Sequence, residues 1–353
     1  MNVSEAISVV TTGNHLKEEE AFAVMSEIMS GAVSDARIAG LITALRMKGE
    51  TVEEITGFVR AIRAKAEAIK PQTVGLMDTC GTGGDLLNTF NISTTAAFVV
   101  AACGVPVAKH GNRCVSSKSG SADVLEALGV ELNISPEAAA ECIDQTGIGF
   151  LFAPLFHAAM KYAVQPRKEV GIRTVFNLVG PLANPAGAAF QLVGVSDPAL
   201  TEPLAGVLLA LGAEAALVVH GAGGMDELST LGETRVTEVK NKQITTYTLN
   251  PEMLGLPAAA PTDLGGGTAG ENAVITRAIL NGEPGPRQDI VVLNAAAALY
   301  AAGRAKDFHE GIKLAREAIT SKEALQKLEL LREFTGKINC GKGVEAKEEP
   351  NLA

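Results

Sequence analysis

A glycine-rich segment in the first quarter of the chain is the first candidate for binding chemistry. Residues 78–85 read DTCGTGGD, with three glycines in four positions. Because glycine has no Cβ, backbone N–H groups there can surround an anion closely. The segment is neither a Walker loop nor a G-x-G-x-x-G fingerprint, and a simple tight turn is the alternative interpretation.

Polar side chains follow this segment directly, before an apolar helix that we predict over residues 96–102. Hydroxyl and amide groups at a helix N-terminus suit phosphate oxygens, which the helix dipole also attracts. Ordinary capping, which needs only one such residue, is the alternative. The group consists of Asn88, Thr89, Asn91, Ser93, Thr94 and Thr95.

A second segment, KHGNRCVSSKSG over residues 109–120, gives the strongest single signal. It brings three cations, Lys109, Arg113 and Lys118, together with several serines, into a chain that is acidic overall. A helix predicted to start near Ala122 would direct its positive end back at this segment. The combination favours a polyphosphate ligand, and a solvated basic loop is the alternative.

Two adjacent carboxylates end a third segment, HGAGGMDE over residues 220–227. Asp226 and Glu227 follow a predicted strand and a glycine turn. Carboxylates beside a phosphate loop suit Mg²⁺, which takes few protein ligands and completes its shell with water and phosphate oxygens. An ordinary surface Asp-Glu pair is the alternative.

Arg167 is the candidate for binding a carboxylate group. Its guanidinium offers paired donors that match a carboxylate. A salt bridge to Glu169 is the alternative. The residues before it supply a mixed apolar surface, formed by Phe152, Pro154, His157, Met160 and Tyr162.

The first 70 residues are predicted to be helical. One helix spans about 18–30, and a second runs from a Ser34 cap to Gly49. A third starts at the T-x-x-E capping box of Thr51 and Glu54 and is expected to end at Pro71. Short amphipathic helices cannot build a large core alone, so they must pack on the rest of the chain or on a second copy.

Beyond Pro71, short apolar segments alternate with glycine-rich loops and helical stretches. Strands are predicted at 76–78, 105–108, 190–195 and 216–219, which implies a largely parallel sheet flanked by helices. Ligands bind beyond the carboxyl ends of such strands, so the loops after them should form one shared site. Residues 231–249 favour an appended β-hairpin, 257–270 a loop, 290–334 helices, and the tail from Lys342 a frayed end.

Composition sets limits on location and partners. The chain has 353 residues, which suggests two domains or one large α/β domain with an addition, and its formal charge is 30 − 40 = −10. This charge argues against nonspecific binding to nucleic acid or anionic membranes. The five cysteines include no C-x-x-C pair, and neither a secretory signal nor a membrane span is visible, so we expect a cytoplasmic protein.

Taken together, the motifs resemble those of the anthranilate phosphoribosyltransferase family, in order and spacing, over nearly the whole chain. They are GTGGD at 81–85, NIST at 91–94, KHGNR at 109–113, RTVFNLVGPLANPA at 173–186 and MDE at 225–227. Two departures are Cys114, where the family more often has Ser, and Thr95, where Ala is usual. We expect little effect from either.

The resemblance implies a fold similar to that of pyrimidine nucleoside phosphorylases. A small helical domain, residues 1–72 with a returning segment near 170–190, would form a homodimer face. A large α/β domain, residues 73–353, would bind phosphoribosyl pyrophosphate (PRPP) and Mg²⁺. The implied reaction transfers phosphoribose from PRPP to the amine of anthranilate, an early step of tryptophan synthesis. The rival interpretations are a nucleoside phosphorylase-like enzyme and a non-catalytic relative that binds nucleic acid.

Site residues are also implied by the resemblance, position by position. No general base or nucleophile is assigned, because an aryl amine is neutral near pH 7. The Mg²⁺ ligands would be Ser93, Asp226 and Glu227. The anthranilate contacts would be Gly81, His110, Asn112 and Arg167. The PRPP site would comprise Gly81, Gly84, Asp85, Thr89, Asn91, Ile92, Ser93, Thr94, Lys109, His110, Gly111, Asn112, Arg113, Cys114, Val115, Ser116, Ser117 and Ser121.

Overall fold

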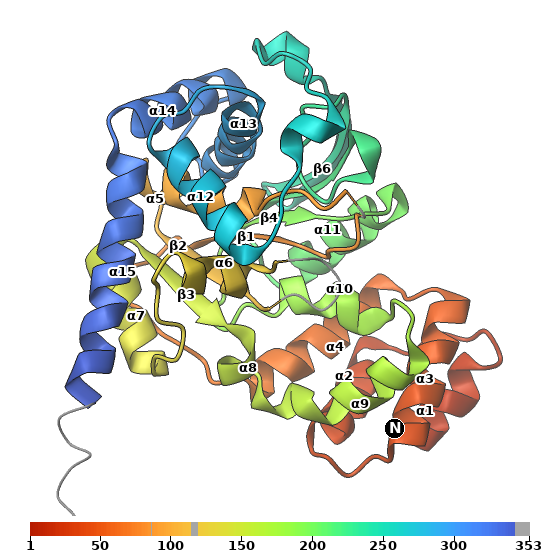
Figure 1. The fold of residues 1–353 in the computed structure, drawn as a ribbon. Helices are drawn as coiled ribbons and strands as arrows, with labels where there is room; N and C mark the ends of the chain where they lie inside the picture. Colours follow the sequence, from red (N-terminus) through yellow and green to blue (C-terminus); the bar gives the residue numbers. More distant parts are fainter. Residues whose placement is uncertain (86, 114–118, 343–353) are drawn as a thin grey trace, which may run out of the picture.

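A helical lobe and a larger α/β lobe make up the molecule (Figure 1). The computed structural model describes residues 1–85, 87–113 and 119–342. The helical lobe contains the first four helices and two that return from the middle of the chain. These are α1 (Val3–Val10), α2 (Glu18–Met29), α3 (Asp35–Lys48), α4 (Val52–Lys65), α9 (Lys161–Val170) and α10 (Val175–Leu182).

Local sequence signals fix the ends of these helices. The predicted capping box at α4 is confirmed, since Glu54 N donates to Thr51 Oγ1 at 3.3 Å and Thr51 N donates to Glu54 Oε2 at 2.9 Å. Gly49 ends α3 at φ 86°, as predicted. The expected end of the third helix at Pro71 is wrong. Its last residue is Lys65, because Ala66 already turns to an extended conformation.

In the part of the chain that the structure describes, seven strands form one sheet in the order β3-β2-β1-β4-β5-β6-β7. The first five strands in the chain are parallel, and the last two are antiparallel. The predicted α/β fold is therefore confirmed. The strands are β1 (Met77–Gly81), β2 (Val107–Gly111), β3 (Ile148–Phe152), β4 (Phe190–Gly194), β5 (Ala215–Gly221), β6 (Thr234–Lys240) and β7 (Gln243–Leu249).

The predicted hairpin is confirmed at β6 and β7. Asn241 and Lys242 connect the two strands with φ values of 52° and 60°. Two positive φ values in a two-residue connection are typical of a type I′ turn, whose twist matches that of the flanking strands. Strand β3, by contrast, was not predicted: of its residues only Phe152 was interpreted, as part of an apolar surface.

Helices cover both faces of the sheet, and the alternation of strand residues assigns each face to one core. In β5, Leu217 and Val219 join the core beneath α5, α13 and α15, whereas Ala216 and Val218 join the core of the helical lobe. The N-terminal helices therefore bury their apolar sides against the rest of the same chain. The helices on the first face are α5 (Ile92–Ala102), α12 (Ala269–Leu280), α13 (Pro286–Ala301), α14 (Phe308–Thr320) and α15 (Glu323–Lys342).

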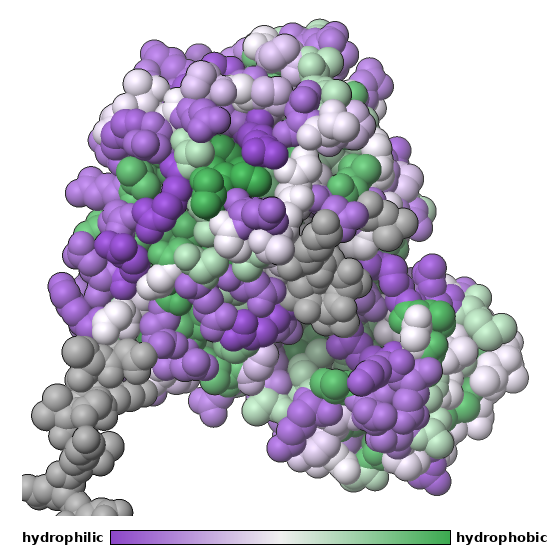
Figure 2. Space-filling view, in the orientation of Figure 1, coloured by the Kyte–Doolittle hydropathy of each residue, from purple (hydrophilic) through white to green (hydrophobic). Residues whose placement is uncertain are grey.

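Helices α6 (Ser121–Ala127) and α7 (Pro136–Thr146) connect β2 to β3, and α8 (Ala153–Phe156) follows β3. Helix α11 (Thr201–Ala210) lies on the second face. The C-terminal helices begin at Ala269, earlier than the predicted residue 290. The expected frayed tail lies outside the described residues. Hydrophilic side chains cover most of the face seen in Figure 2. No helix in the described ranges has the length and apolarity to cross a membrane.

Candidate active site

Loops from four strands meet at the carboxyl edge of the sheet, and glycines make the close approach feasible. Gly81 pairs with Gly194 in the strand register. A Cβ on Gly81 would lie 2.3 Å from Asp226 Oδ2, and one on Gly194 would lie 1.5 Å from the Asp226 carbonyl oxygen. The segment after β5 therefore crosses over the ends of β4 and β1 and places its carboxylate beside the GTGGD segment.

The side chains of Asp226 and Glu227 contact two segments that were predicted to bind phosphate, the glycine-rich segment and the polar residues that follow it. Asp226 Oδ2 accepts a hydrogen bond from Gly83 N at 2.7 Å, and Glu227 Oε1 accepts one from Ser93 N at 3.1 Å. Burial raises the pKa of Asp226 to about 6. Burial, followed by repulsion from Asp226, raises the pKa of Glu227 to about 8. Because these two carboxylates are buried and repel each other, binding of a cation between them and a ligand would stabilise their charged forms.

The donor set fits Mg²⁺. Asp226, Glu227 and the Ser93 hydroxyl are hard oxygen ligands, and Mg²⁺ needs only a few of these when phosphates and water complete its shell. Within the described ranges, no group of three or more His, Cys, Asp or Glu side chains is arranged to hold a metal ion.

Lys109 lies in a buried strand, whereas the sequence placed it in a basic loop. It lies in β2 with only 3% of its surface exposed, and its ammonium donates to Thr79 O and to Ser93 Oγ, the latter at 3.3 Å. Burial lowers the pKa of this amine, while the Asp78 carboxylate opposes the shift. Its position beneath Ser93 places a positive charge under the candidate phosphate site.

Arg113 is paired with carboxylates, whereas the sequence analysis interpreted it as a cation for a phosphate. Its Nη2 donates to Glu126 Oε1 at 2.6 Å, and its Nη1 lies 3.2 Å from Asp123 Oδ1. The first turns of α6 thus neutralise the charge that sequence reasoning assigned to a phosphate. Residues 114–118, including the predicted Cys114, Val115, Ser116 and Ser117 and the cation Lys118, lie outside the described residues.

The remaining predicted PRPP residues gather around the same edge. Thr89 forms an antiparallel bridge with Gly265. The Ser121 hydroxyl donates to Asn112 O at 3.3 Å. Asp85 Oδ1 accepts from Leu87 N at 3.3 Å, and burial raises the pKa of this carboxyl. Ile92 and Thr94 are buried in the first turn of α5, while Gly111 ends β2.

Arg173 is a site residue that sequence reasoning missed. Its Nη2 donates to Thr82 O at 3.0 Å, and a Cβ on Gly84 would lie 2.0 Å from its Nη1. A guanidinium therefore packs directly on the GTGGD segment from the helical side of the molecule. Its place at the start of the quoted motif RTVFNLVGPLANPA was the only signal that could have found it.

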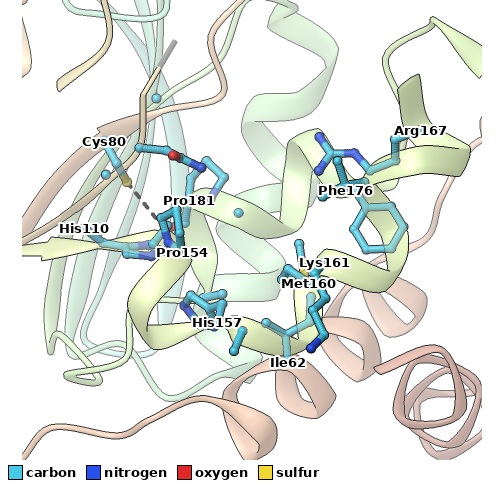
Figure 3. A pocket seen from close by; sticks show the side chains of 18 residues that line it. Ile62, Cys80, His110, Pro154, His157, Met160, Lys161, Arg167, Phe176 and Pro181 are labelled. Atoms are coloured by element: carbon cyan, nitrogen blue, oxygen red, sulfur yellow. Dashed lines mark hydrogen bonds between the residues drawn. The ribbon is translucent and has the colours of Figure 1, made fainter. Parts of the chain in front are cut away.

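A cavity of about 410 Å³ opens next to this edge, between the two lobes. Figure 3 shows Arg167 and Phe176 at one end of the lining and Cys80 and His110 at the other, with His157 near the floor. The walls are mainly apolar, so the cavity suits a flat hydrophobic ligand with few polar groups.

Arg167 and Lys161 are the two cations among the described residues that line this cavity. Its guanidinium carbon lies 5.2 Å from the centre of the Phe176 ring, and burial lowers its pKa. Glu169 accepts a hydrogen bond from Gln165 at 2.6 Å. Among the described residues Arg167 has no ion-pair partner, so the alternative of a salt bridge to Glu169 is not formed. An anionic ligand group would find an uncompensated charge here.

Two buried histidines contribute polar groups to the lining. The rings of His110 and His157 meet edge to face, with their centroids 5.0 Å apart. Burial lowers the pKa of His110 to about 3 and that of His157 to about 4. Both rings are therefore neutral at physiological pH and can donate or accept a hydrogen bond without adding charge.

Comparison with known proteins identifies the family. Residues 4–66 match the model described as the helical bundle domain of a glycosyl transferase family, and residues 73–325 match the model of its a/b domain. An anthranilate phosphoribosyltransferase from Acetivibrio thermocellus is 56% identical over 333 residues, covering 94% of this chain and 96% of that protein. The chain belongs to the anthranilate phosphoribosyltransferase family.

Solved structures of the family share the fold. The enzyme of Thermus thermophilus superposes with a TM-score of 0.90 at 48% identity, covering 94% of this chain and 99% of that one. The enzyme from Saccharomyces cerevisiae in complex with PRPP and Mg has a TM-score of 0.88 at 26% identity, covering 95% of this chain and 98% of that one. The same yeast enzyme has also been solved with 4-fluoroanthranilate.

Proposed function

We propose that this chain transfers the 5-phosphoribosyl group of PRPP to the amine of anthranilate, giving N-(5-phosphoribosyl)anthranilate and pyrophosphate in tryptophan biosynthesis. The observation that carries the proposal is the junction of two unlike sites. An apolar cavity containing the unpaired Arg167 opens beside an edge where glycine N–H groups and paired carboxylates converge. One aromatic acid and one Mg²⁺-bound polyphosphate fit these two sites.

PRPP would occupy the carboxyl edge of the sheet, at the residues that the family resemblance implies. The glycine-rich residues 81–84, at and after the end of β1, and the N-terminus of α5 lie at that edge, and a helix N-terminus attracts phosphate oxygens. Ser93, Asp226 and Glu227 would hold Mg²⁺, which supplies charge neutralisation for the departing pyrophosphate. The buried amine of Lys109 lies close to the Ser93 hydroxyl and, when protonated, would stabilise negative charge at the same position.

Anthranilate would lie in the cavity, with its ring against the apolar wall and its carboxylate at Arg167. The amine needs no strong base, because it is neutral at physiological pH and its lone pair is available. The neutral rings of His110 and His157 are consistent with this, since they orient a ligand by hydrogen bonds and leave its charge unchanged. The protein then has to align the amine with the ribose carbon that loses pyrophosphate.

Anthranilate fluorescence provides the direct test. We expect the signal to decay when the purified chain is mixed with anthranilate, PRPP and Mg²⁺, and to persist when PRPP or Mg²⁺ is omitted. Pyrophosphate should appear in equal amount. Uridine with inorganic phosphate is the matched control for a nucleoside phosphorylase. Release of uracil without loss of anthranilate would refute the proposal.

We also propose that the helical lobe, with domain bounds near 1–72 and a returning segment near 170–190, forms a homodimer. Several large apolar side chains on this lobe stay exposed in the single chain: Phe22, Met47, Tyr162, Val164 and Ile172. Exposed apolar residues on one lobe favour a protein partner over solvent. Sedimentation at micromolar concentration should show a dimer, and a monomer there would contradict the proposal. A cytoplasmic location stays a prediction.

A further inference from the structure

A chain of amide hydrogen bonds reaches the PRPP side of the site from the C-terminal third of the sequence. Asn272 lies in the first turn of α12 and is 1% exposed. Its Oδ1 accepts from Gly267 N at 2.8 Å, and its Nδ2 donates to Asn91 Oδ1 at 2.9 Å. Asn91 occupies the N-cap position of α5 without a side-chain bond to the helix, and its Nδ2 donates to Ser119 O at 3.2 Å.

The two backbone groups at the ends of this chain fix the orientation of both amides. Gly267 contributes an N–H, which can only donate, and Ser119 contributes a carbonyl, which can only accept. Between them, Asn272 and Asn91 satisfy all three hydrogen bonds only when both side chains point the same way. Turning either amide over would bring two donors or two acceptors face to face.

The loop that carries Gly267 is itself tied across the segment before α5. Thr89 and Gly265 form an antiparallel bridge, and Gly266 N donates to Asn88 O at 2.9 Å. The Arg287 guanidinium donates to the carbonyl of Gly265 at 2.9 Å. We call residues 263–268 the strap. It gives Asn272 a fixed reference point, so the amide chain starts from an anchored N–H group.

We propose that Asn272 is a positioning residue for PRPP. By fixing the orientation of the Asn91 amide, it ties the N-terminus of α5 to the end of the 109–120 segment at Ser119. These are two of the segments that the proposed function assigns to PRPP, so the inference rests on that function. Asn272 reaches the site only through Asn91 and the strap, and it is not assigned to either substrate.

The next turn of the same two helices provides a matched control. Thr95 and Thr276 lie four residues beyond Asn91 and Asn272, and their hydroxyls are 3.0 Å apart in the buried interface. This contact joins α5 to α12 but does not lead to Ser119. Thr276→Val therefore removes one buried hydrogen bond between these helices and leaves the amide chain in place.

The variants Asn272→Ala, Asn272→Asp and Thr276→Val, compared with wild type, test the inference. Binding of PRPP with Mg²⁺ is measured by calorimetry at pH 8 without anthranilate, followed by KM for each substrate, kcat and melting temperature. Loss of one or two neutral hydrogen bonds corresponds to roughly a 3- to 30-fold weaker binding of PRPP. We expect that change in Asn272→Ala, with KM for anthranilate close to wild type.

Asn272→Asp separates orientation from packing. It has nearly the same shape and can accept from Gly267, but a carboxylate cannot donate to Asn91 Oδ1. The Asn91 amide must then turn its oxygen toward Ser119 O, so Asn272→Asp should weaken PRPP binding at least as much as Asn272→Ala. This variant also keeps the test decisive if the alanine variant fails to fold.

Three results would overturn the inference. Thr276→Val could weaken PRPP binding as much as Asn272→Ala, which would indicate general loosening of the helix pair. The Asn272 variants could melt earlier with PRPP binding unchanged, which would leave Asn272 a structural residue only. Asn272→Asp could bind PRPP like wild type. Since the calorimetry needs no anthranilate, a failure of the proposed transfer reaction would be seen separately, as wild-type PRPP binding without turnover.

Discussion

Replacing Arg167 tests the proposed division between the aromatic cavity and the phosphate edge. The Arg167 guanidinium is partly buried, stacks on Phe176 and has no ion-pair partner among the described residues. Its desolvation is therefore uncompensated until an anion binds. Arg167→Ala should remove the attraction for the anthranilate carboxylate and should cost the free chain little stability.

The expected size follows from the type of contact. A hydrogen bond to a charged group is worth about 1.5–3 kcal/mol, which at 1.4 kcal/mol per decade is roughly a 10- to 150-fold change in binding. Against this, the free chain loses one cation–π contact of about 0.5–1 kcal/mol and regains the hydration of a buried cation. We therefore expect KM for anthranilate to rise by that factor, while the free energy of unfolding changes by under about 1 kcal/mol.

The assay is the loss of anthranilate fluorescence at saturating PRPP and Mg²⁺, with KM for PRPP measured in parallel. Arg167→Lys keeps the charge but loses the paired donors, so it should recover only part of the affinity. Lys168→Ala is the matched control, because this neighbouring cation is exposed and does not line the cavity. Aniline, which lacks the carboxylate, should be a poor substrate for wild type and lose little more in Arg167→Ala.

One pattern of results would refute this reasoning. If Arg167→Ala raises KM for PRPP and leaves that for anthranilate unchanged, Arg167 belongs to the phosphate site. The aromatic pocket would then have to be sought elsewhere. An equal change for both substrates in Lys168→Ala would show that the assay reports only the overall charge of α9.

Three further variants test the metal site, the buried histidines and the helical lobe. Asp226→Asn with Glu227→Gln should abolish Mg²⁺-dependent turnover without lowering the melting temperature, since two repelling buried carboxylates are removed; full activity would contradict the metal assignment. The pKa of His157 falls from 6.5 to about 4 on folding. Below pH 6.5 the unfolded chain therefore binds the extra proton, and between pH 6.5 and 5 wild type should lose about 1.5 kcal/mol more than His157→Asn in urea titrations; parallel curves would disprove this. Glu54 is fully buried and pairs with Lys48 at 2.8 Å. Glu54→Ala should therefore lower the free energy of unfolding by about 3–5 kcal/mol in the same titration. Glu54→Gln, which can still accept a hydrogen bond at the cap, should lower it clearly less.

The sequence predicted those parts of the fold that depend on residues lying close together in the chain. The Thr51 and Glu54 box lies within one helical turn, and the Asn241-Lys242 turn lies within one hairpin. Both could be predicted because the groups that interact are close in sequence. The glycine-rich ends of the strands were found for the same reason: a missing Cβ is a local property, even when the atom that needs the space comes from a distant loop such as Asp226.

Other features could not be predicted, because they depend on contacts between distant residues. The uniformly apolar β3 has no alternation that would distinguish it from a buried helix. The burial of Lys109 and the pairing of Arg113 with Glu126 are settled only when β2 and α6 are placed. Asn272 and Asn91 are 181 residues apart, and nothing in the Ala-, Pro- and Gly-rich segment before α12 marks it as a strap.

The same contrast explains why the site lies where the two lobes meet. Binding a polyphosphate needs many N–H groups and a metal, which strand ends, glycine turns and a helix N-terminus provide together on the α/β lobe. Binding an aromatic acid needs a dry wall and one cation, which α9 and α10 provide from the helical lobe through Arg167 and Phe176. Among the described residues, the phosphate-side groups come mainly from the α/β lobe, and Arg167 and Phe176 come from the helical lobe. The reacting amine and the ribose carbon can therefore meet only along their shared boundary, where His110 and Gly81 of the sheet line the same cavity as Arg167.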